Sequence, residues 1–491
     1  MSTNPAMIAL RRFGLGARPG DIAKVGSDPR GFLLASFDRR SEILLDDPDL
    51  EPSHVTFSAQ MVANQQKRAA DLIKRETALD AAQQAISNNS KLDNTQQRAA
   101  ARAQRPLTNM EQQARVQPPL QKAARIRVEN FVDEATVRFR HQASTDVAFP
   151  ERLAMFWSNH FCIMARGQIR GMAGAYEREV IRPHVLGRFV DMLKAVEQHP
   201  AMLMYLNNEQ SFGPNSPAGK NQKKGLNENL ARETLELHTL GVDGGYTQTD
   251  VTNYAKIITG WTLANLNTPG AIPGKFFYAP MRHEPGDWVV LGKTYPDRGM
   301  QTGIEAQEDF ARHPATARHI ARKLASHFVA DDPPSSLVAK LEKTFRDTEG
   351  NLAEVSRALI SADESWAPAA KKLLPPVDLV VALSRSLPYK TGAGEMLRLA
   401  NQLGQPLWQP NSPKGFPDDD NGWTNPSALN ERLRIAEQVA RQLDKSLDPR
   451  QLAEQVLGPD MHPETRQAIA HAETHEQGLE LLIMSPDFQR R

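Results

Sequence analysis

The chain has 491 residues and carries 59 Lys and Arg against 58 Asp and Glu, which gives a formal net charge of +1. Such an even balance provides no overall field that would favour nucleic acid or an anionic membrane as a partner. A mean hydropathy of −0.51 and the lack of a long apolar run exclude a membrane span. The single cysteine, Cys162, excludes an internal disulfide.

The first segment, 1–54, predicts short helices around a Gly- and Pro-rich turn. Its Arg11-Arg12 pair resembles the start of a twin-arginine export signal, but no hydrophobic stretch follows it. We therefore expect a cytoplasmic protein. The Gly14-Leu-Gly16 sequence is not a dinucleotide-binding fingerprint, because no strand precedes it.

The second segment, 55–145, is rich in Ala, Gln and Arg and poor in large apolar residues. It predicts two long polar helices joined by a linker near Asn88–Pro119, which together form a peripheral arm. The fold class that we expect is mainly α: a large irregular helical body at 146–491, with a small β-hairpin near 276–295 and this arm. Shortening the linker should leave the fold intact.

Two helices in the body each place a histidine on an apolar face. In 149–161, His160 shares a stripe at helical spacing with Leu153, Phe156 and Trp157. In 314–328, His327 shares a face with several apolar residues. Each inward histidine is either a hydrogen-bonded core residue or a functional group, and the pattern leaves both interpretations open.

The stretch 226–261 holds the densest set of unusual polar residues, and it predicts a helix, a tight turn and a second helix. Glu233 lies within the apolar stripe between Leu230 and Leu237. A buried carboxylate needs a partner, so we expect Glu233 to be buried and bound by protein groups or a metal. Thr247-Gln-Thr-Asp250 predicts a capping box that starts the second helix.

Further polar groups surround Glu233 in the sequence. Asn229 and Glu236 flank one edge of the stripe and His238 the other, and Glu228 with Arg232 begins a charge ladder along the helix. The preceding loop, Gly213–Gly225, is either a lid or a plain surface loop.

Two other segments carry polar or aromatic clusters. The strands Phe276–Tyr278 and Trp288–Leu291 predict a hairpin whose tip, His283–Asp287, holds His, Glu and Asp together. The long loop from Gln405 to Pro426 contains Trp408, Phe416, Trp423 and three successive aspartates. Loops of this length in compact domains are usually functional, although aromatic residues also fasten helices together.

Taken together, these segments resemble a known family. The pieces that carry the resemblance are Leu10–Gly14, Glu151–Phe161, His199–Leu203, Asn227–Gly241, Thr259–Trp261, Pro314–Ala317 and the 405–423 loop. The chain is identified by them as a member of the bacterial "domain of unknown function 1800" family. The resemblance implies a fold but no settled activity, and it implies a possible protein partner from a sulfatase-like family. The chain differs in having no export signal, Asn207 in place of an acidic residue, and Phe416 in place of Trp.

Two classes of function follow. The first is a hydrolase or other acid/base enzyme on a carbohydrate-like substrate, with catalytic residues Glu233, Glu236, His238 and His283. Its substrate would be bound by His160, Asn208, Asn227, Asn229, Arg232, Asp287, Trp408 and Trp423, and a divalent metal is possible. The alternative is a non-catalytic scaffold or partner protein in which these polar residues hold buried helices together.

Two arrangements would favour the enzyme. His160 should reach the polar cluster of the central 226–241 segment, because its only inward polar group needs a partner. The loop 213–225, the hairpin tip and the 408–423 loop should meet over Glu233 as the walls of one cleft.

Overall fold

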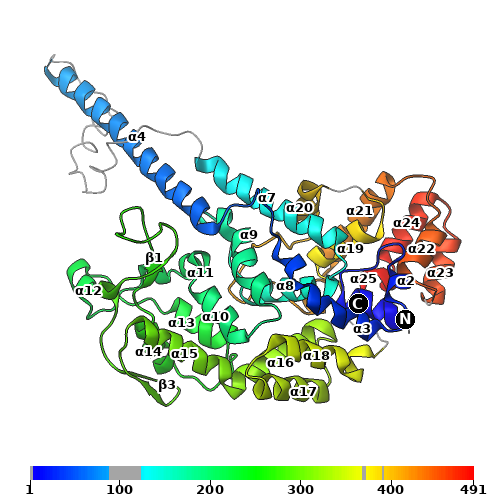
Figure 1. The fold of residues 1–491 in the computed structure, drawn as a ribbon. Coiled ribbons are helices and arrows are strands. Elements are labelled where there is room, and N and C mark those ends of the chain that lie inside the picture. Colours follow the sequence, from blue (N-terminus) through cyan, green and yellow to red (C-terminus); the bar gives the residue numbers. More distant parts are fainter. Residues whose placement is uncertain (1–3, 88–122, 368–371, 390–391, 460) are drawn as a thin grey trace.

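The computed structural model describes residues 4–87, 123–367, 372–389, 392–459 and 461–491. It is mainly α-helical with a small β-hairpin, as the sequence predicts, and its strands form two small antiparallel sheets. Figure 1 shows an elongated helical body in which the N- and C-terminal segments lie at the same end. Within the described ranges, no helix combines the length and the apolar character that crossing a membrane requires.

Many helices begin with a proline, whose fixed φ suits the first helical position and whose missing N–H would have no partner there. The residue before it often caps the helix, as where Asn425 accepts a hydrogen bond from the N–H of Ala428 at 3.0 Å. Helices of this kind are α1 (Pro5–Ile8), α3 (Pro29–Ala35), α11 (Pro200–Tyr205), α12 (Pro217–Gln222), α16 (Pro314–Phe328), α19 (Pro376–Ser386), α21 (Pro426–Gln442), α22 (Pro449–Leu457), α23 (Pro463–Ala470) and α25 (Pro486–Gln489). Other helices are α2 (Asp21–Val25), α8 (Ala148–His160), α9 (Ala173–Tyr176), α10 (Phe189–Glu197), α14 (Gln248–Ile257), α15 (Met300–Arg312), α17 (Ser335–Asp347), α18 (Leu352–Ser361), α20 (Ala393–Gln402) and α24 (His475–Met484).

A cluster of aromatic rings joins the N-terminal segment to the body. The ring of Phe13 lies 6.0 Å from that of Phe149 on α8 and 5.9 Å from that of Phe328 on α16. Aromatic pairs at such distances add specific attraction to the apolar area that they bury. The core therefore connects helices that are more than a hundred residues apart in the sequence.

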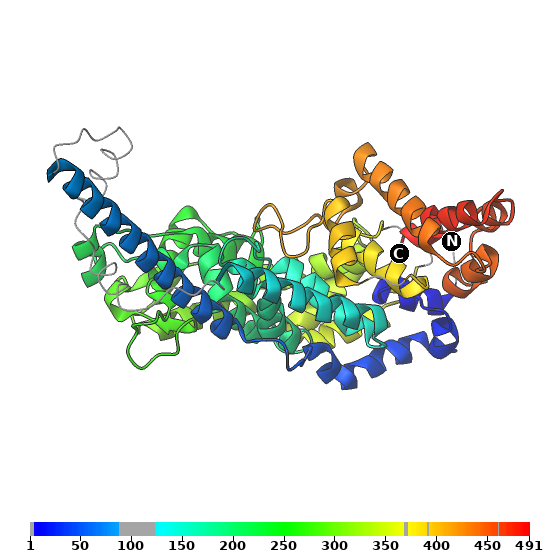
Figure 2. The same ribbon diagram turned by 90° about the horizontal axis from the view of Figure 1, so that it is seen from above.

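The predicted arm is peripheral only in part. Figures 1 and 2 both show α4 (Ser53–Ser87) projecting from the body. In α7 (Ala123–Ser144), however, Phe131, Ala135 and Phe139 recur every four residues, form one face and are at most 4% exposed. The expectation that all of 55–145 lies outside the body is therefore wrong for α7, although the division into domains stays a prediction. The predicted linker, Asn88–Pro119, lies outside the described residues.

The β structure is close to the expected place but pairs differently. Strand β1 (Trp261–Leu263) pairs with β2 (Phe276–Tyr278), and β3 (Trp288–Val290) pairs with β4 (Lys293–Tyr295). The predicted pairing of 276–278 with 288–291 is therefore wrong. Leu291 and Gly292 both have positive φ, of 51° and 76°. A two-residue turn of that geometry folds β3 back on its immediate neighbour.

The central segment begins as predicted and ends in a wider helical turn. Helix α13 (Asn229–Glu233) continues into a π-helical turn, Thr234–His238, and Gly241 turns the chain at φ +87°. The capping box of Thr247 and Asp250 at the start of α14 is confirmed. The last carbonyls of a helix have no partner within it, so those of Leu237 and His238 are free to accept from other side chains.

Candidate functional site

A cleft of about 980 Å³ lies between α8, α16 and the 405–422 segment. This volume falls at the upper end of the range of small-molecule sites, about 300–1,000 Å³. One wall is a polar stripe on α16, since His319, Lys323 and His327 are spaced four residues apart and all three line the cleft. His160 and Trp408 also line the cleft.

Two histidines of the cleft are held by the end of the central segment. The Nε2–H of His160 donates to the carbonyl of His238 at 3.1 Å, and the Nε2–H of His319 donates to that of Leu237 at 3.2 Å. The prediction that His160 reaches the central segment is therefore confirmed. A carbonyl can only accept, so both rings must carry their proton on Nε2 when neutral.

The surroundings keep both rings neutral. Burial, reinforced by the charge of Lys323, lowers the pKa of His160 well below its usual value. The same two causes lower the pKa of His319 to about 4. With Nε2 engaged, Nδ1 carries the lone pair in each ring, and Nδ1 of His160 is buried without a partner among the described residues. The cleft therefore contains two neutral imidazole acceptors, with ring centroids 6.1 Å apart.

Lys323 is the cation between these histidines and the 405–422 segment. Within the described part of the chain it forms no hydrogen bond or ion pair. Burial lowers its pKa, and Asp418 partly offsets that effect. A lysine placed in this way can bind an anionic group of a ligand.

A buried carboxylate supports the wall behind His160. Glu197 of α10 is fully buried and accepts hydrogen bonds from the Thr234 hydroxyl at 2.9 Å and from Nδ1 of His238 at 2.7 Å. His238 is itself 1% exposed. This dyad fixes the turn whose carbonyls bind the two cleft histidines.

A second histidine–carboxylate pair lies at the other end of the stripe. Nδ1 of His327 contacts the Asp418 carboxylate at 2.9 Å. The backbone carbonyl of Asp418 accepts a hydrogen bond from the Lys372 ammonium group. The His327 pair lowers the pKa of Asp418 against the effect of burial. Asp418 therefore fastens the 405–422 segment to α16.

The two glutamates assigned to catalysis differ in position. Glu236 lines the cleft and accepts a hydrogen bond from the Tyr246 hydroxyl at 3.2 Å. Glu233 is half-buried rather than buried, and no described residue donates a hydrogen bond to its carboxylate. Burial raises its pKa, His238 opposes this and Glu236 adds to it. The expectation of a buried, fully satisfied Glu233 is therefore wrong, because the stripe that contains it ends at the surface.

The two tryptophans of the long loop serve different purposes. Trp408 lines the cleft and donates its indole N–H to Glu177 at 2.9 Å. Glu177 also accepts from Arg138 and Arg182, so Trp408 belongs to a buried ion-pair network. Trp423 donates to the carbonyl of Pro417 at 3.0 Å and holds its own loop closed.

A protein-family model described as "Protein of unknown function (DUF1800)" matches residues 8–490. The chain belongs to this family. The match spans nearly the whole chain and confirms the resemblance carried by the Glu151–Phe161 and Asn227–Gly241 segments. No curated protein and no solved structure matches the chain.

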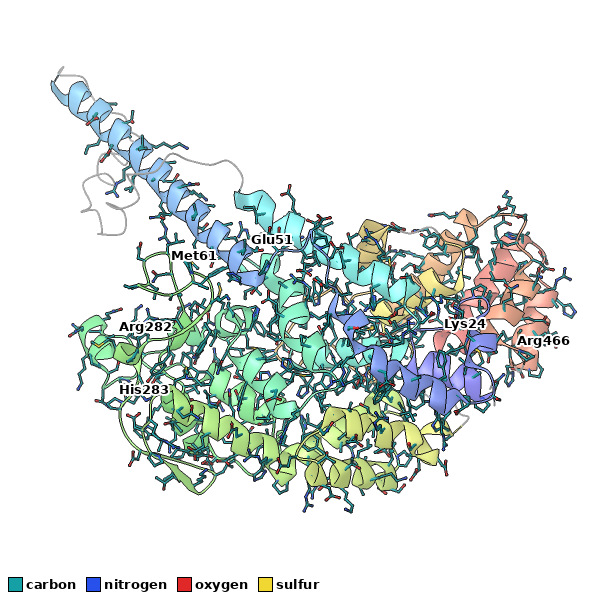
Figure 3. The ribbon with its side chains drawn as sticks, viewed as in Figure 1. Lys24, Glu51, Met61, Arg282, His283 and Arg466 are labelled. Carbon is teal, nitrogen blue, oxygen red and sulfur yellow. The ribbon has the colours of Figure 1, made fainter. Side chains whose placement is uncertain are left out.

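In this DUF1800 chain the hairpin tip and the 213–225 loop meet each other away from the cleft. Glu284 accepts from the backbone and side-chain nitrogens of Asn215, at 2.7 and 2.6 Å. His283 is engaged at both ring nitrogens, by the carbonyl of Thr259 and by Asp297, and Asp287 accepts from the N–H of Asp297. Figure 3 shows His283 at the end of the body opposite to Arg466. Of the three segments expected to form one cleft, only the 408–423 loop lines the cleft beside α16. The expected single cleft of three walls is therefore not formed.

The remaining residues assigned to substrate binding lie in local networks. Asn208 is buried and donates to the carbonyl of Trp261 at 3.0 Å. Asn227 accepts from the N–H of Asn229, whose own side chain is exposed. Arg232 contacts Glu228 and Gln248. Their roles in binding stay predictions.

Sequence reasoning missed Lys323, His319 and Glu197 as members of the site. His319, Lys323 and His327 recur every four residues, so the sequence does display a polar stripe along this helix. The apolar pattern of 314–328 indicates only His327 as an inward polar residue. Glu197 has no comparable signal, because its partners lie 37 and 41 residues away. Among the described residues of this family member, no three His, Cys, Asp or Glu side chains are placed to hold one metal ion.

Proposed function

We propose that the chain is an acid/base enzyme of the hydrolase type, which acts in the cleft on a carbohydrate-like substrate that carries a negative charge. The observation that supports this most is the pair of neutral imidazoles beside Lys323. Both rings are held through Nε2 and offer Nδ1 as a proton acceptor. His319 is the more exposed of the two, so it is the better candidate for the base.

The charge of Lys323 links substrate binding to the strength of that base. Lys323 contributes to the low pKa of His319, and an imidazole with a pKa of about 4 is a weak base at neutral pH. An anionic group bound to Lys323 would offset its charge and raise the pKa of His319. The base would then become effective when an anionic substrate occupies the cleft.

The other residues take supporting parts. His319 would remove a proton from the water that attacks the anomeric carbon as the glycosidic C–O bond breaks, and the leaving oxygen would take up a proton from solvent. Lys323 would bind the anionic group of the sugar. Glu236 would accept a hydrogen bond from a substrate hydroxyl, and the face of Trp408 would pack against the sugar ring. Glu233 and His238 do not line the cleft, and their direct participation stays a prediction.

The test compares p-nitrophenyl glycosides in matched pairs, glucuronide with glucoside and galacturonide with galactoside. We expect turnover of a uronide, a loss of at least about 100-fold in kcat for His319→Gln, and a raised KM for Lys323→Met. The Lys323→Met effect should be confined to the charged member of each pair. Failure of the wild type to turn over any uronide, or an equal effect of Lys323→Met on both members, contradicts the proposal.

A scaffold function is the second candidate, and one observation favours it. Most of the polar residues singled out in the sequence bond to other protein groups, as where His238 donates to Glu197 and Trp408 donates to Glu177. Buried polar networks of this kind also serve to define a structure. The partner would be a protein of the sulfatase-like type. Co-purification with such a protein that survives His319→Gln and Lys323→Met, together with no glycoside turnover, would favour this candidate.

A further inference from the structure

A second cavity lies between the N-terminal segment and the C-terminal helices. Its volume is about 500 Å³. Figures 1 and 2 both show the N-terminal segment beside these C-terminal helices. The apolar part of its wall comes from Met7, Ile8, Ala468, Leu481 and Met484. None of these residues belongs to the cleft with the α16 stripe.

Four arginines also line this cavity, and three of them have partners. Arg12 donates to the carbonyl of Ser365 at 2.6 Å, Arg490 pairs with Asp420 at 2.8 Å, and Arg491 pairs with Asp378. Arg11 differs from them, because it forms no hydrogen bond or ion pair within the described ranges. Burial lowers its pKa to about 10, and only the charge of Asp487 opposes this.

The carboxylates of the wall form no ion pair with Arg11. Asp487 accepts from the Thr465 hydroxyl at 2.6 Å and from the N–H of His462 at 3.1 Å. Glu464 lies beside His462 and is exposed. A desolvated guanidinium without a partner is costly, and a carboxylate matches its planar pair of donors.

We propose that this cavity binds a medium-chain carboxylic acid, with its carboxylate on Arg11 and its alkyl chain along Met7, Ile8 and Leu481. A single unpaired arginine fits a head group with one negative charge. Asp487 and Glu464 in the same wall disfavour a head group with two. The apolar side chains then account for an alkyl tail rather than a small acid such as acetate. The site is separate from the cleft and does not depend on the function proposed for it.

Calorimetric titration of the full chain with sodium decanoate, below its micelle concentration, tests the proposal. We expect saturable binding of decanoate and no detectable binding of acetate. Arg11→Met should weaken decanoate binding at least about tenfold, since it removes a charge-assisted contact, and should leave decanol binding unchanged. Arg346→Met is the matched control, because it removes an exposed arginine of α17 that does not line the cavity.

Two further variants make the result specific. Ala468→Trp adds a large side chain at an exposed position of the wall, and it should abolish binding of both decanoate and decanol. Lys323→Met should leave decanoate binding unchanged, which separates this cavity from the cationic cleft. Arg11→Met should melt no lower than the wild type, because the half-buried Arg11 forms no ion pair with a described residue that the change would break. No saturable decanoate binding by the wild type, or equal affinity in Arg11→Met, overturns the proposal.

Discussion

At the scale of single residues, the proton position on each histidine decides what the cleft can do. Two successive carbonyls, of Leu237 and His238, hold the Nε2–H groups of His319 and His160. The reverse tautomer would place two lone pairs against two carbonyl oxygens, which is repulsive. Protonation of either ring would add a positive charge beside Lys323, so the site resists it.

This arrangement predicts how stability depends on pH. The unfolded chain titrates His319 near its ordinary value of about 6.5, whereas the folded protein lowers that pKa to about 4. Between pH 6.5 and pH 4 the unfolded state therefore binds more protons than the folded state. The contribution of His319 to the free energy of unfolding is complete above pH 6.5 and is lost as the pH drops toward 4. Between pH 7 and pH 4, the free energy of unfolding of His319→Gln should fall by roughly 1–3 kcal/mol less than that of the wild type.

Urea unfolding at the two pH values measures this difference. His471→Gln is the control, since His471 is exposed on the surface, and it should follow the wild type. Parallel curves for His319→Gln and the wild type would mean that folding leaves the pKa of His319 near its ordinary value.

The sequence anticipated some residue contacts and not others. His160 lies on an apolar face and needs a polar partner, so its contact with the central segment could be predicted. The same reasoning predicts a buried partner for Glu233, and that prediction is wrong. The helical pattern does not show where the apolar stripe meets solvent. The pairing of Glu197 with His238 depends on how two helices cross, which no local pattern records.

At the scale of elements, the π-helical turn and Gly241 together set the position of the cleft histidines. Gly241 has a φ of +87°, and a Cβ added there would lie 2.8 Å from Nδ1 of His319. Gly245 has a similar φ of +84°, but nothing lies within 4 Å of an added Cβ. The two glycines share the same backbone strain and differ in this one contact.

Alanine at each glycine should separate these effects. Gly245→Ala should cost about 1 kcal/mol through the left-handed backbone conformation alone. Gly241→Ala should cost at least about 2 kcal/mol, and it should also shift the NMR-detected pKa of His319, because the ring must move. Denaturant unfolding and the His319 titration are the two measurements. Equal destabilisation with an unchanged titration would show that the contact has no energetic weight.

The helices of the predicted arm provide a second test at this scale. Phe139 of α7 is 1% exposed, whereas Val128 on the same helix is 46% exposed. Phe139→Ala should lower the free energy of unfolding by about 3–5 kcal/mol through lost burial and a cavity, and Val128→Ala should change it by less than about 0.5 kcal/mol. If both variants are neutral in thermal unfolding, α7 is as peripheral as the sequence suggested.

Local and non-local elements also differ in how well the sequence predicted them. The capping box at Thr247 and Asp250 involves neighbours only, and it was predicted correctly. The strand pairing was predicted incorrectly. Both β1 and β3 could pair with β2, and the local sequence does not show which of them does so in the folded chain. The turn at Leu291 and Gly292 favours the short β3–β4 hairpin.

At the scale of the whole molecule, one carboxylate joins segments from across the sequence. Asp378, at the start of α19, accepts from Arg152 of α8 at 2.8 Å and also pairs with Arg491. Arg152 donates in addition to the carbonyl of Gly14. All three charged side chains are at most 7% exposed. The N-terminal segment, the middle of the chain and its last residue thus meet at Asp378, in a wall of the cleft.

Asp378→Asn should therefore destabilise the molecule as a unit. The amide keeps the size of the side chain but leaves Arg152 without a counter-charge and, among the described residues, leaves Arg491 with only Asp418, 3.8 Å away. Breaking a buried pair costs about 3–5 kcal/mol. Asp363→Asn is the matched control, because Asp363 pairs with Arg30 at the surface and is 92% exposed; its cost should stay below about 1 kcal/mol. Calorimetry should show one transition that moves to lower temperature in Asp378→Asn. A second, separate transition in that variant would instead mean that the ends of the chain unfold independently of the body.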